Sequence, residues 1–308
     1  MIVESVAISL GQWIDTETGE FHNWLGEDSR EDCADYLRQK IWEEFQGLQF
    51  NLFGNNKNPI DKPLCDELAV KIKFSDKIIR TTKQVRPGIG VEGSDIRFRE
   101  YNYLYPEEKD EIPSREDKSI VVEELMLGEF RRSSSKKNII AGTIILYTKA
   151  IAVFSDSNHL DYSTVFWSTL MHEAFHAFHF SLLQKIGRQD RWDKKSEKKS
   201  RDIVKESLAA KFEFNSLCKN GRKSLAGIAM LDHLNNTWRK YDIEDWPYSG
   251  AIGIEEEELL CRLIKLSLYD WKTAADIIRT GYYLADPEIK SMFQLVKDPS
   301  IKKNYYLD

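Results

Sequence analysis

The residues best suited to chemistry are five consecutive positions, His172-Glu173-Ala174-Phe175-His176. On a helix, positions four apart lie on the same face, so both imidazole rings can direct a nitrogen at one metal ion. Glu173 is rotated by about 100° from its neighbour, which places it nearer to a water on the metal than to the metal itself. We therefore expect His172 and His176 to be metal ligands and Glu173 to act as a general base in metal-assisted hydrolysis.

The sequence around this motif favours a buried site. Residues 165–183 read VFWSTLMHEAFHAFHFSLL, in which Glu173 is the only charged side chain apart from the histidines. A carboxylate in an apolar helix is costly unless something compensates its charge, and a metal ion would do so. The alternative is a histidine cluster without a metal, but solvated helix faces are rarely this apolar.

A third protein ligand is expected, because catalytic zinc sites use three. Residues 202–214 read DIVKESLAAKFEF, which is compatible with an amphipathic helix. Glu206 is the predicted third ligand, since the small residues after it would let two helices approach closely. Asp202 and Glu213 share roughly the same face, and each is an alternative ligand or a partner that fixes the tautomer of a ligating histidine.

This arrangement resembles the gluzincin group of zinc metallopeptidases, over about residues 139–214. In that group, H-E-x-x-H is followed some tens of residues later by a helix that carries a Glu ligand. The resemblance implies one Zn²⁺ ion per chain and a catalytic Glu173. The implied zinc ligands are His172, His176 and Glu206.

The chain also departs from the gluzincin pattern. Ala210 stands where larger gluzincins often have an Asp, four residues after the ligand Glu. The G-x-M-E-N motif of the aminopeptidase branch is absent. Residues 138–154 resemble the strand region that precedes the active-site helix in these enzymes. The resemblance thus indicates a minimal gluzincin-like core and does not assign a subfamily.

Peptide hydrolysis also needs a hydrogen-bond donor for the oxyanion, in addition to the metal. A downstream Tyr or His often serves this purpose in the family, and the candidates here are His233, Tyr241 and Tyr248. Tyr248 lies in the turn-like sequence WPYSG, which would suit a loop at the rim of a cleft. His179, one turn beyond the motif, is expected to be a buried histidine with a backbone hydrogen bond. Contact with the substrate or with a metal ligand is the alternative.

Composition limits the class of protein. The 308 residues suffice for one large domain or two moderate ones, and 42% hydrophobic and 12% aromatic content is typical of a globular core. The net charge of −6 disfavours nucleic acid and anionic membranes as partners. The sequence contains no apolar run long enough for a membrane span. Glu4 and a short apolar run near the N-terminus argue against a signal peptide. The four cysteines form no C-x-x-C pair. We therefore expect a cytoplasmic protein with reduced thiols.

The hydrophobic periodicity predicts strands mainly in the first half of the chain and helices mainly in the second half. The predicted strands cover residues 2–14, 68–79, 95–104, 120–129 and 139–154. The predicted helices cover 28–47, 163–187 (the motif helix), 225–239, 255–271, 273–284 and 287–295. The predicted loops and connections cover 51–63, the charged segment 106–118, the basic segment 131–137 and the exposed connection 185–201.

These patterns together predict an α+β fold. A mixed α/β module of unknown role would occupy residues 1–117. A zincin-like domain would occupy residues 118–308, with a small mixed sheet against the motif helix and a helical C-terminal lobe. The predicted function is zinc-dependent hydrolysis of peptide bonds, with a peptide or protein as substrate.

Two other functions remain open at this point. Deformylase-type enzymes hydrolyse a different amide with the same H-E-x-x-H motif, although their E-G-C-L-S sequence is absent here. A binding or regulatory protein could carry a structural or vestigial zinc site. In that case a fourth protein ligand, His179 or Glu213, would close the metal coordination.

Overall fold

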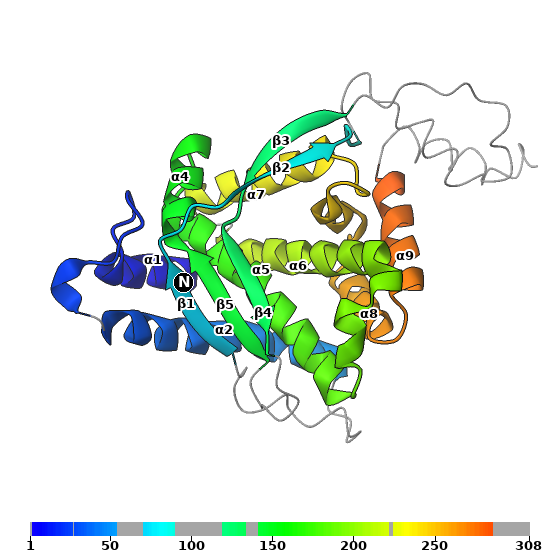
Figure 1. The fold of residues 1–308 in the computed structure, drawn as a ribbon, viewed down its shortest axis with the longest axis horizontal. Helices are drawn as coiled ribbons and strands as arrows, with labels where there is room; N and C mark the ends of the chain where they lie inside the picture. Colours follow the sequence, from blue (N-terminus) through cyan, green and yellow to red (C-terminus); the bar gives the residue numbers. More distant parts are fainter. Residues whose placement is uncertain are drawn as a thin grey trace, which may run out of the picture.

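The computed structural model describes residues 2–26, 28–53, 70–89, 119–133, 141–221 and 224–285 (Figure 1). The fold is a mixture of helices and small sheets in which helices predominate. None of the helices in these segments combines the length and the apolar composition that a bilayer span requires.

The strands form two small sheets. In the first, β5 (Gly142–Tyr147) lies in the middle, parallel to β1 (Val70–Ser75) on one side and antiparallel to β4 (Gly128–Arg132) on the other. In the second, β2 (Arg80–Val85) and β3 (Ile120–Leu125) form an antiparallel pair. Within the described part of the chain, β4 is therefore an edge strand.

The helices surround these sheets, and α5 (Tyr162–Lys185) lies at the centre of the fold, in contact with β4, β5 and α6 (Figure 1). The other α-helices are α1 (Ile2–Trp13), α2 (Asp28–Phe53), α4 (Thr148–Asn158), α6 (Lys198–Gly221), α7 (Leu225–Lys240), α8 (Glu257–Ser267) and α9 (Trp271–Leu284). Short 3₁₀ helices connect them: η1 (Asn23–Leu25), η4 (Gln189–Asp193), η5 (Lys195–Glu197) and η6 (Pro247–Gly253).

The motif helix predicted over residues 163–187 is confirmed as α5. Asp161 caps its N-terminus, because the Asp161 side chain accepts a hydrogen bond from the backbone N–H of Thr164. Gly187, with a φ of 70°, follows its C-terminus and allows the chain to turn away. Nearly all of its side chains are buried, as expected for a helix that is apolar on every face.

The strand predicted over residues 2–14 is wrong, because this segment forms α1. Its β-branched residues suggested a strand, but the buried positions Val6, Leu10 and Ile14 are spaced by four. This spacing places all three on one face of a helix, which packs against α2 and α5.

Two further strand predictions need correction. The segment 139–154 is a strand only as far as Tyr147, and α4 begins at Thr148 with buried residues at helical spacing. The segment 120–129 contains two strands, β3 and the start of β4, which belong to different sheets. In each case the chain changes direction within the segment, and hydrophobicity alone does not show where.

The remaining helix and strand predictions agree with the structure where it describes them, but three predicted loops overlap regular elements. Residues 51–53 belong to α2, 131–132 to β4 and 198–201 to α6. The helix predicted from residue 28 extends further, to Phe53, and the strand predicted over 68–79 is β1. The three helices predicted over 225–284 correspond to α7, α8 and α9, and the connection 185–201 contains η4 and η5. The predictions for 95–104, 106–118 and 287–295, and most of 51–63 and 131–137, lie outside the described residues.

The predicted domain boundary at residue 117 also lies outside the described residues. Strands from the two sides of this position pair with each other, β1 with β5 and β2 with β3. One hydrophobic core contains residues from both parts, from Val6 to Tyr283.

Candidate metal and catalytic site

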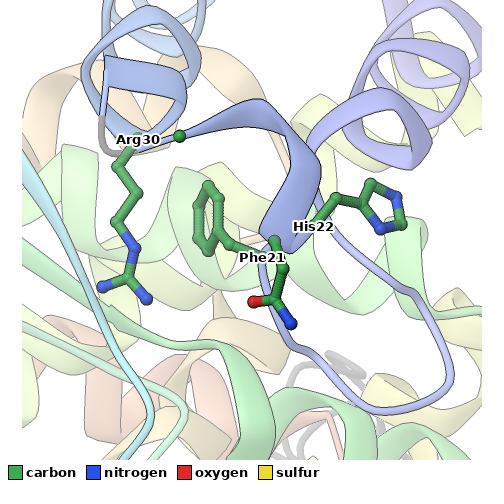
Figure 2. A pocket seen from close by; sticks show the side chains of 5 residues that line it. Phe21, His22 and Arg30 are labelled. Atoms are coloured by element: carbon green, nitrogen blue, oxygen red, sulfur yellow. The ribbon is translucent and has the colours of Figure 1, made fainter.

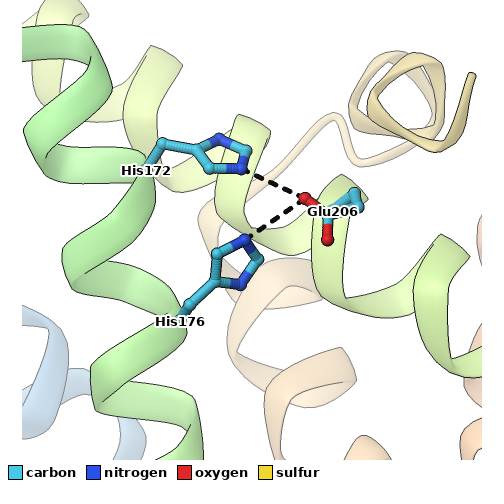
Figure 3. Close-up of side chains that lie close together, drawn as sticks. All are labelled: His172, His176 and Glu206. Atoms are coloured by element: carbon cyan, nitrogen blue, oxygen red, sulfur yellow. Dashed lines mark hydrogen bonds and ion pairs between the residues drawn. The ribbon is translucent and has the colours of Figure 1, made fainter. Parts of the chain in front are cut away.

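Three side chains converge between α5 and α6 (Figure 3). The Nε2 atoms of His172 and His176 each lie 3.2 Å from the same atom, Oε2 of Glu206. The nearest ligand atoms of the three residues lie within 4.8 Å of one another. Both histidines are buried, and Glu206 is partly buried. This group could hold a metal ion.

The hydrogen bonding of His172 fits a metal ligand. Its Nδ1 lies 3.0 Å from Oε2 of Glu213, an acceptor, so Nδ1 carries a proton and donates it to that carboxylate. In the neutral ring, Nε2 then presents a lone pair towards Glu206. A lone pair and a carboxylate oxygen 3.2 Å apart repel each other unless a proton or a cation lies between them. Two imidazole nitrogens and a carboxylate oxygen are a suitable ligand set for zinc and related transition metals.

The charges of this cluster are strongly coupled. Burial alone would lower the pKa of His172, but hydrogen bonds to Glu206 and Glu213 raise it well above its usual value. Burial alone would raise the pKa of Glu206, but the two histidines hold it well below its usual value. Burial lowers the pKa of His176, which favours the neutral ring that a metal requires.

Small residues next to Glu206 allow η6 to pack closely on α6. Ser207, Ala209 and Ala210 are fully buried. The Ser207 hydroxyl donates a hydrogen bond of 2.7 Å to the carbonyl of Pro247 in η6. Gly250 of η6 lies against the same hydroxyl, where a Cβ atom would collide with it. These contacts fix η6 on α6, next to the metal ligands.

Glu213 and Asp202 have different surroundings, although both share the helix face of Glu206. Glu213 lies two turns further along α6 and binds His172, and it also accepts a hydrogen bond from the Ser168 hydroxyl. Asp202 instead pairs with Arg201 at 3.0 Å and with Lys198 at 3.9 Å. Glu213 therefore occupies the place of a partner that orients a ligating histidine, and Asp202 does not.

Replacing Glu213 by Ala is expected to weaken metal binding by about 10–100-fold, because His172 would lose the acceptor that fixes its tautomer. The measurement is the Zn²⁺ dissociation constant, from competition with a chromophoric chelator. Asp202→Ala is the matched control on the same helix and should bind Zn²⁺ as the wild type does. Equal affinities for the wild type and both variants would contradict this role of Glu213.

Glu173, about 100° around α5 from His172, faces the edge strand β4. Only 9% of its surface is exposed, and burial raises the pKa of its carboxyl group to about 7. The backbone N–H of Phe130 in β4 faces the carboxylate and opposes this rise. Gly128 permits the close approach, since a Cβ atom there would lie 2.9 Å from Cγ of Glu173. Gly128 was not among the residues predicted from the sequence, because its only signal was a glycine inside an apolar run.

Tyr248 is the one oxyanion candidate that the structure places beside the metal ligands. It lies on η6, half-buried, with its ring centroid 5.4 Å from that of His172. Burial raises the pKa of its hydroxyl well above the usual value, and the nearby carboxylates of Glu206, Glu173 and Glu213 add to this effect. The hydroxyl therefore stays protonated and can donate a hydrogen bond.

The other two candidates lie elsewhere. His233 belongs to α7, where its ring packs edge-on against Phe154 at 5.4 Å. The ring of Tyr241 packs on Trp246 at 5.0 Å. Its backbone carbonyl accepts hydrogen bonds from other parts of the core. The ring of each residue thus packs against another aromatic side chain, which is typical of a structural role.

His179 is buried, as expected, but its hydrogen-bond partner is a side chain and not the backbone. The Ser267 hydroxyl donates to the carbonyl of Ile264 at 2.6 Å, so it must accept a hydrogen bond from Nε2 of His179 at 2.8 Å. Burial lowers the pKa of His179 to about 3, so the ring is neutral at physiological pH. His179 therefore supports the packing of α5 against α8 and does not face the metal ligands.

A separate surface pocket lies near the N-terminus (Figure 2). It is lined by Phe21, His22, Asn23, Gly26 and Arg30. The guanidinium of Arg30 lies 4.8 Å over the ring of Phe21, and Nε2 of His22 lies 3.1 Å from a backbone carbonyl. No residue of the histidine cluster lines this pocket.

Comparisons of the chain with protein-family models, with curated proteins and with solved structures give no match. The resemblance to gluzincins therefore rests on the site residues themselves. What the site does has to be argued from its chemistry.

Proposed function

We propose that this protein is a zinc-dependent peptidase. In this proposal His172, His176 and Glu206 hold the metal, and Glu173 is the general base. The observation that carries it is the convergence of both Nε2 atoms on one carboxylate oxygen, with a buried glutamate of raised pKa next to the first histidine. These are the groups that gluzincin-type hydrolysis requires.

The chain's own residues account for the proton transfers. A bound zinc ion lowers the pKa of its water towards about 7 and polarises the substrate carbonyl. Glu173 takes a proton from the attacking water and later gives it to the leaving amine. Burial raises the pKa of Glu173, which favours return of the proton to the leaving amine, and a zinc ion bound nearby would favour the carboxylate form that accepts it. Glu213 keeps His172 in the tautomer that presents Nε2.

The edge strand β4 supports a peptide as the substrate. In the described part of the chain, β5 pairs with one side of β4 and no strand pairs with the other. An extended peptide can bind such an edge through backbone hydrogen bonds. Glu173 lies against this strand, so a peptide bound there would pass close to the general base.

The alternative of a closed, structural metal site has less support. It requires a fourth protein ligand, and His179 and Glu213 were the candidates. Glu213 binds the far nitrogen of His172, and His179 binds Ser267. Neither side chain is directed at the position between the three ligands, which favours an open coordination site.

The proposal is tested by elemental analysis of the purified protein, followed by incubation of the zinc-loaded protein with a peptide library. We expect about one zinc per chain and cleavage at defined peptide bonds that a hydroxamate inhibits. Absence of zinc binding after reconstitution would refute the proposal. Zinc binding without cleavage of any peptide would instead favour a structural site or a different amide substrate.

Replacing Tyr248 by Phe is expected to lower kcat by about 10²-fold, because one donor to the oxyanion is lost. KM should change little, since the ring remains in place. Steady-state kinetics on a peptide from the library give both values. Tyr241→Phe is the matched control, because the ring of Tyr241 packs on Trp246, whereas that of Tyr248 packs on His172. A wild-type kcat for Tyr248→Phe would remove Tyr248 from the mechanism.

A further inference from the structure

A lysine next to the metal ligand Glu206 has no role in the mechanism above. Lys205 is half-buried, and its ammonium nitrogen lies 4.0 Å from the ring centroid of Trp192. This is a cation–π contact, and within the described segments the ammonium makes no hydrogen bond to a protein acceptor. Among the residues that the structure describes, no carboxylate lies within ion-pair distance of this amine.

Trp192 places this ammonium at the His176 end of the site. The indole lies on η4, with its ring centroid 6.3 Å from that of His176 and 6.2 Å from that of Phe130 in β4. It therefore lies between the edge strand and α6.

The carboxylates near Lys205 already have other partners. Burial lowers the pKa of Lys205, whereas the charges of Glu206, Asp202 and Asp193 favour the ammonium form and Arg201 opposes it. Asp202 pairs with Arg201, Asp193 pairs with Arg132, and Glu206 faces the two histidines. In the described segments, Lys205 is thus the cation at this end of the site that remains available for an external anion.

We propose that Lys205 binds a carboxylate of the substrate next to the scissile bond, so that the enzyme prefers acidic peptides. This inference rests on the proposed peptidase function. An ammonium that is half-buried and held on an indole has lost part of its hydration, so a substrate carboxylate would restore charge-assisted hydrogen bonds. A peptide on the edge of β4 would pass Trp192 and bring its side chains or its C-terminus within reach.

The carboxylate has two possible sources. One is an Asp or Glu side chain, and the other is the free C-terminus of the peptide. Each is distinguished by a matched substrate pair that differs in one group. The first pair exchanges Glu for Gln beside the scissile bond in a peptide blocked at both ends. The second pair exchanges a C-terminal carboxylate for a carboxamide.

The experiment measures kcat/KM for both pairs with zinc-loaded protein, using the peptide that the library identifies as the best substrate. The wild type should prefer the carboxylate member of one pair by about tenfold or more. Lys205→Met, which keeps an apolar stem on Trp192, should bring this ratio close to one. Lys205→Arg should keep most of the preference, and Lys219→Met, at the far end of α6, should keep all of it.

A binding measurement separates recognition from catalysis. Zinc-loaded Glu173→Gln protein is titrated calorimetrically with the same peptide pairs, with and without Lys205→Met. The ratio of dissociation constants should follow the kinetic ratio. A wild-type ratio near one, or an equal loss for both members in Lys205→Met, would overturn the role of Lys205 and leave the peptidase function intact. Absence of cleavage of any library peptide would instead refute the proposed function, and this inference with it.

Discussion

Replacing Glu173 by Gln is expected to reduce peptide hydrolysis by about 10³–10⁴-fold and to leave zinc binding unchanged. The amide keeps the shape of the side chain between α5 and Gly128, but it cannot accept the proton of the attacking water. The loss should be large because the same carboxylate acts twice, first as a base and then as an acid. The measurements are kcat on a library peptide and zinc content by elemental analysis.

Asp202→Asn is the matched control for this variant. It makes the same exchange of carboxylate for amide, on α6, at a side chain whose ion pairs go to Arg201 and Lys198. Its kcat should stay close to that of the wild type. The role of Glu173 would be refuted if Glu173→Gln hydrolysed the peptide at the wild-type rate. If Glu173→Gln lost zinc as well, Glu173 would have to be reassigned as a metal ligand.

The cluster of His172, His176 and Glu206 could be predicted from sequence because helix geometry determines much of its arrangement locally. A spacing of four positions on α5 brings the two rings onto one face, and α6 brings Glu206 opposite them. The third ligand could be named only because Glu206 was flanked by such residues. The choice between Asp202 and Glu213 could not be made from spacing. It depends on where α5 and α6 cross, which is a property of the tertiary structure.

The surroundings of the general base were not predictable for the same reason. Gly128 lies far from Glu173 in sequence, and a strand break beside it was hidden within an apolar run. The β-branched residues of α1 also favoured a strand, whereas packing of Val6 and Leu10 against the core stabilises a helix. Local preference is a weaker signal than burial on one face of a helix.

The roles of single polar residues were the least predictable. The hydroxyl of Ser267 became the partner of His179, although 88 positions separate them in the chain. Trp192 and Lys205 carried no motif at all, and their position next to His176 arises only when η4 folds back over α5. Sequence patterns therefore identified the candidate ligands, whereas the groups proposed to select the substrate could be found only from the fold.

Replacing Glu206 by Ala is expected to weaken zinc binding by more than about 100-fold. This exceeds the loss expected for Glu213→Ala, because Glu206 is proposed to bind the metal directly, whereas Glu213 only orients His172. Both histidines direct Nε2 at this carboxylate, so a metal between them would lose the oxygen that completes the set. The zinc dissociation constants should rank with Glu206→Ala weakest, Glu213→Ala intermediate and Asp202→Ala equal to wild type. Asp202, Glu206 and Glu213 lie on roughly the same face of α6, so the three variants serve as controls for one another.

Thermal unfolding with and without zinc shows whether Glu206→Ala loses a ligand or loses the fold. Zinc at about 100 times its dissociation constant stabilises the wild type by about 2.7 kcal/mol, since only the folded chain holds the three ligands together. Glu206→Ala should unfold cooperatively and gain almost nothing from the same zinc concentration. A cooperative transition that still rises with zinc as in the wild type would show that Glu206 is not a ligand. Glu213 would then be the next carboxylate to test, since it already contacts His172.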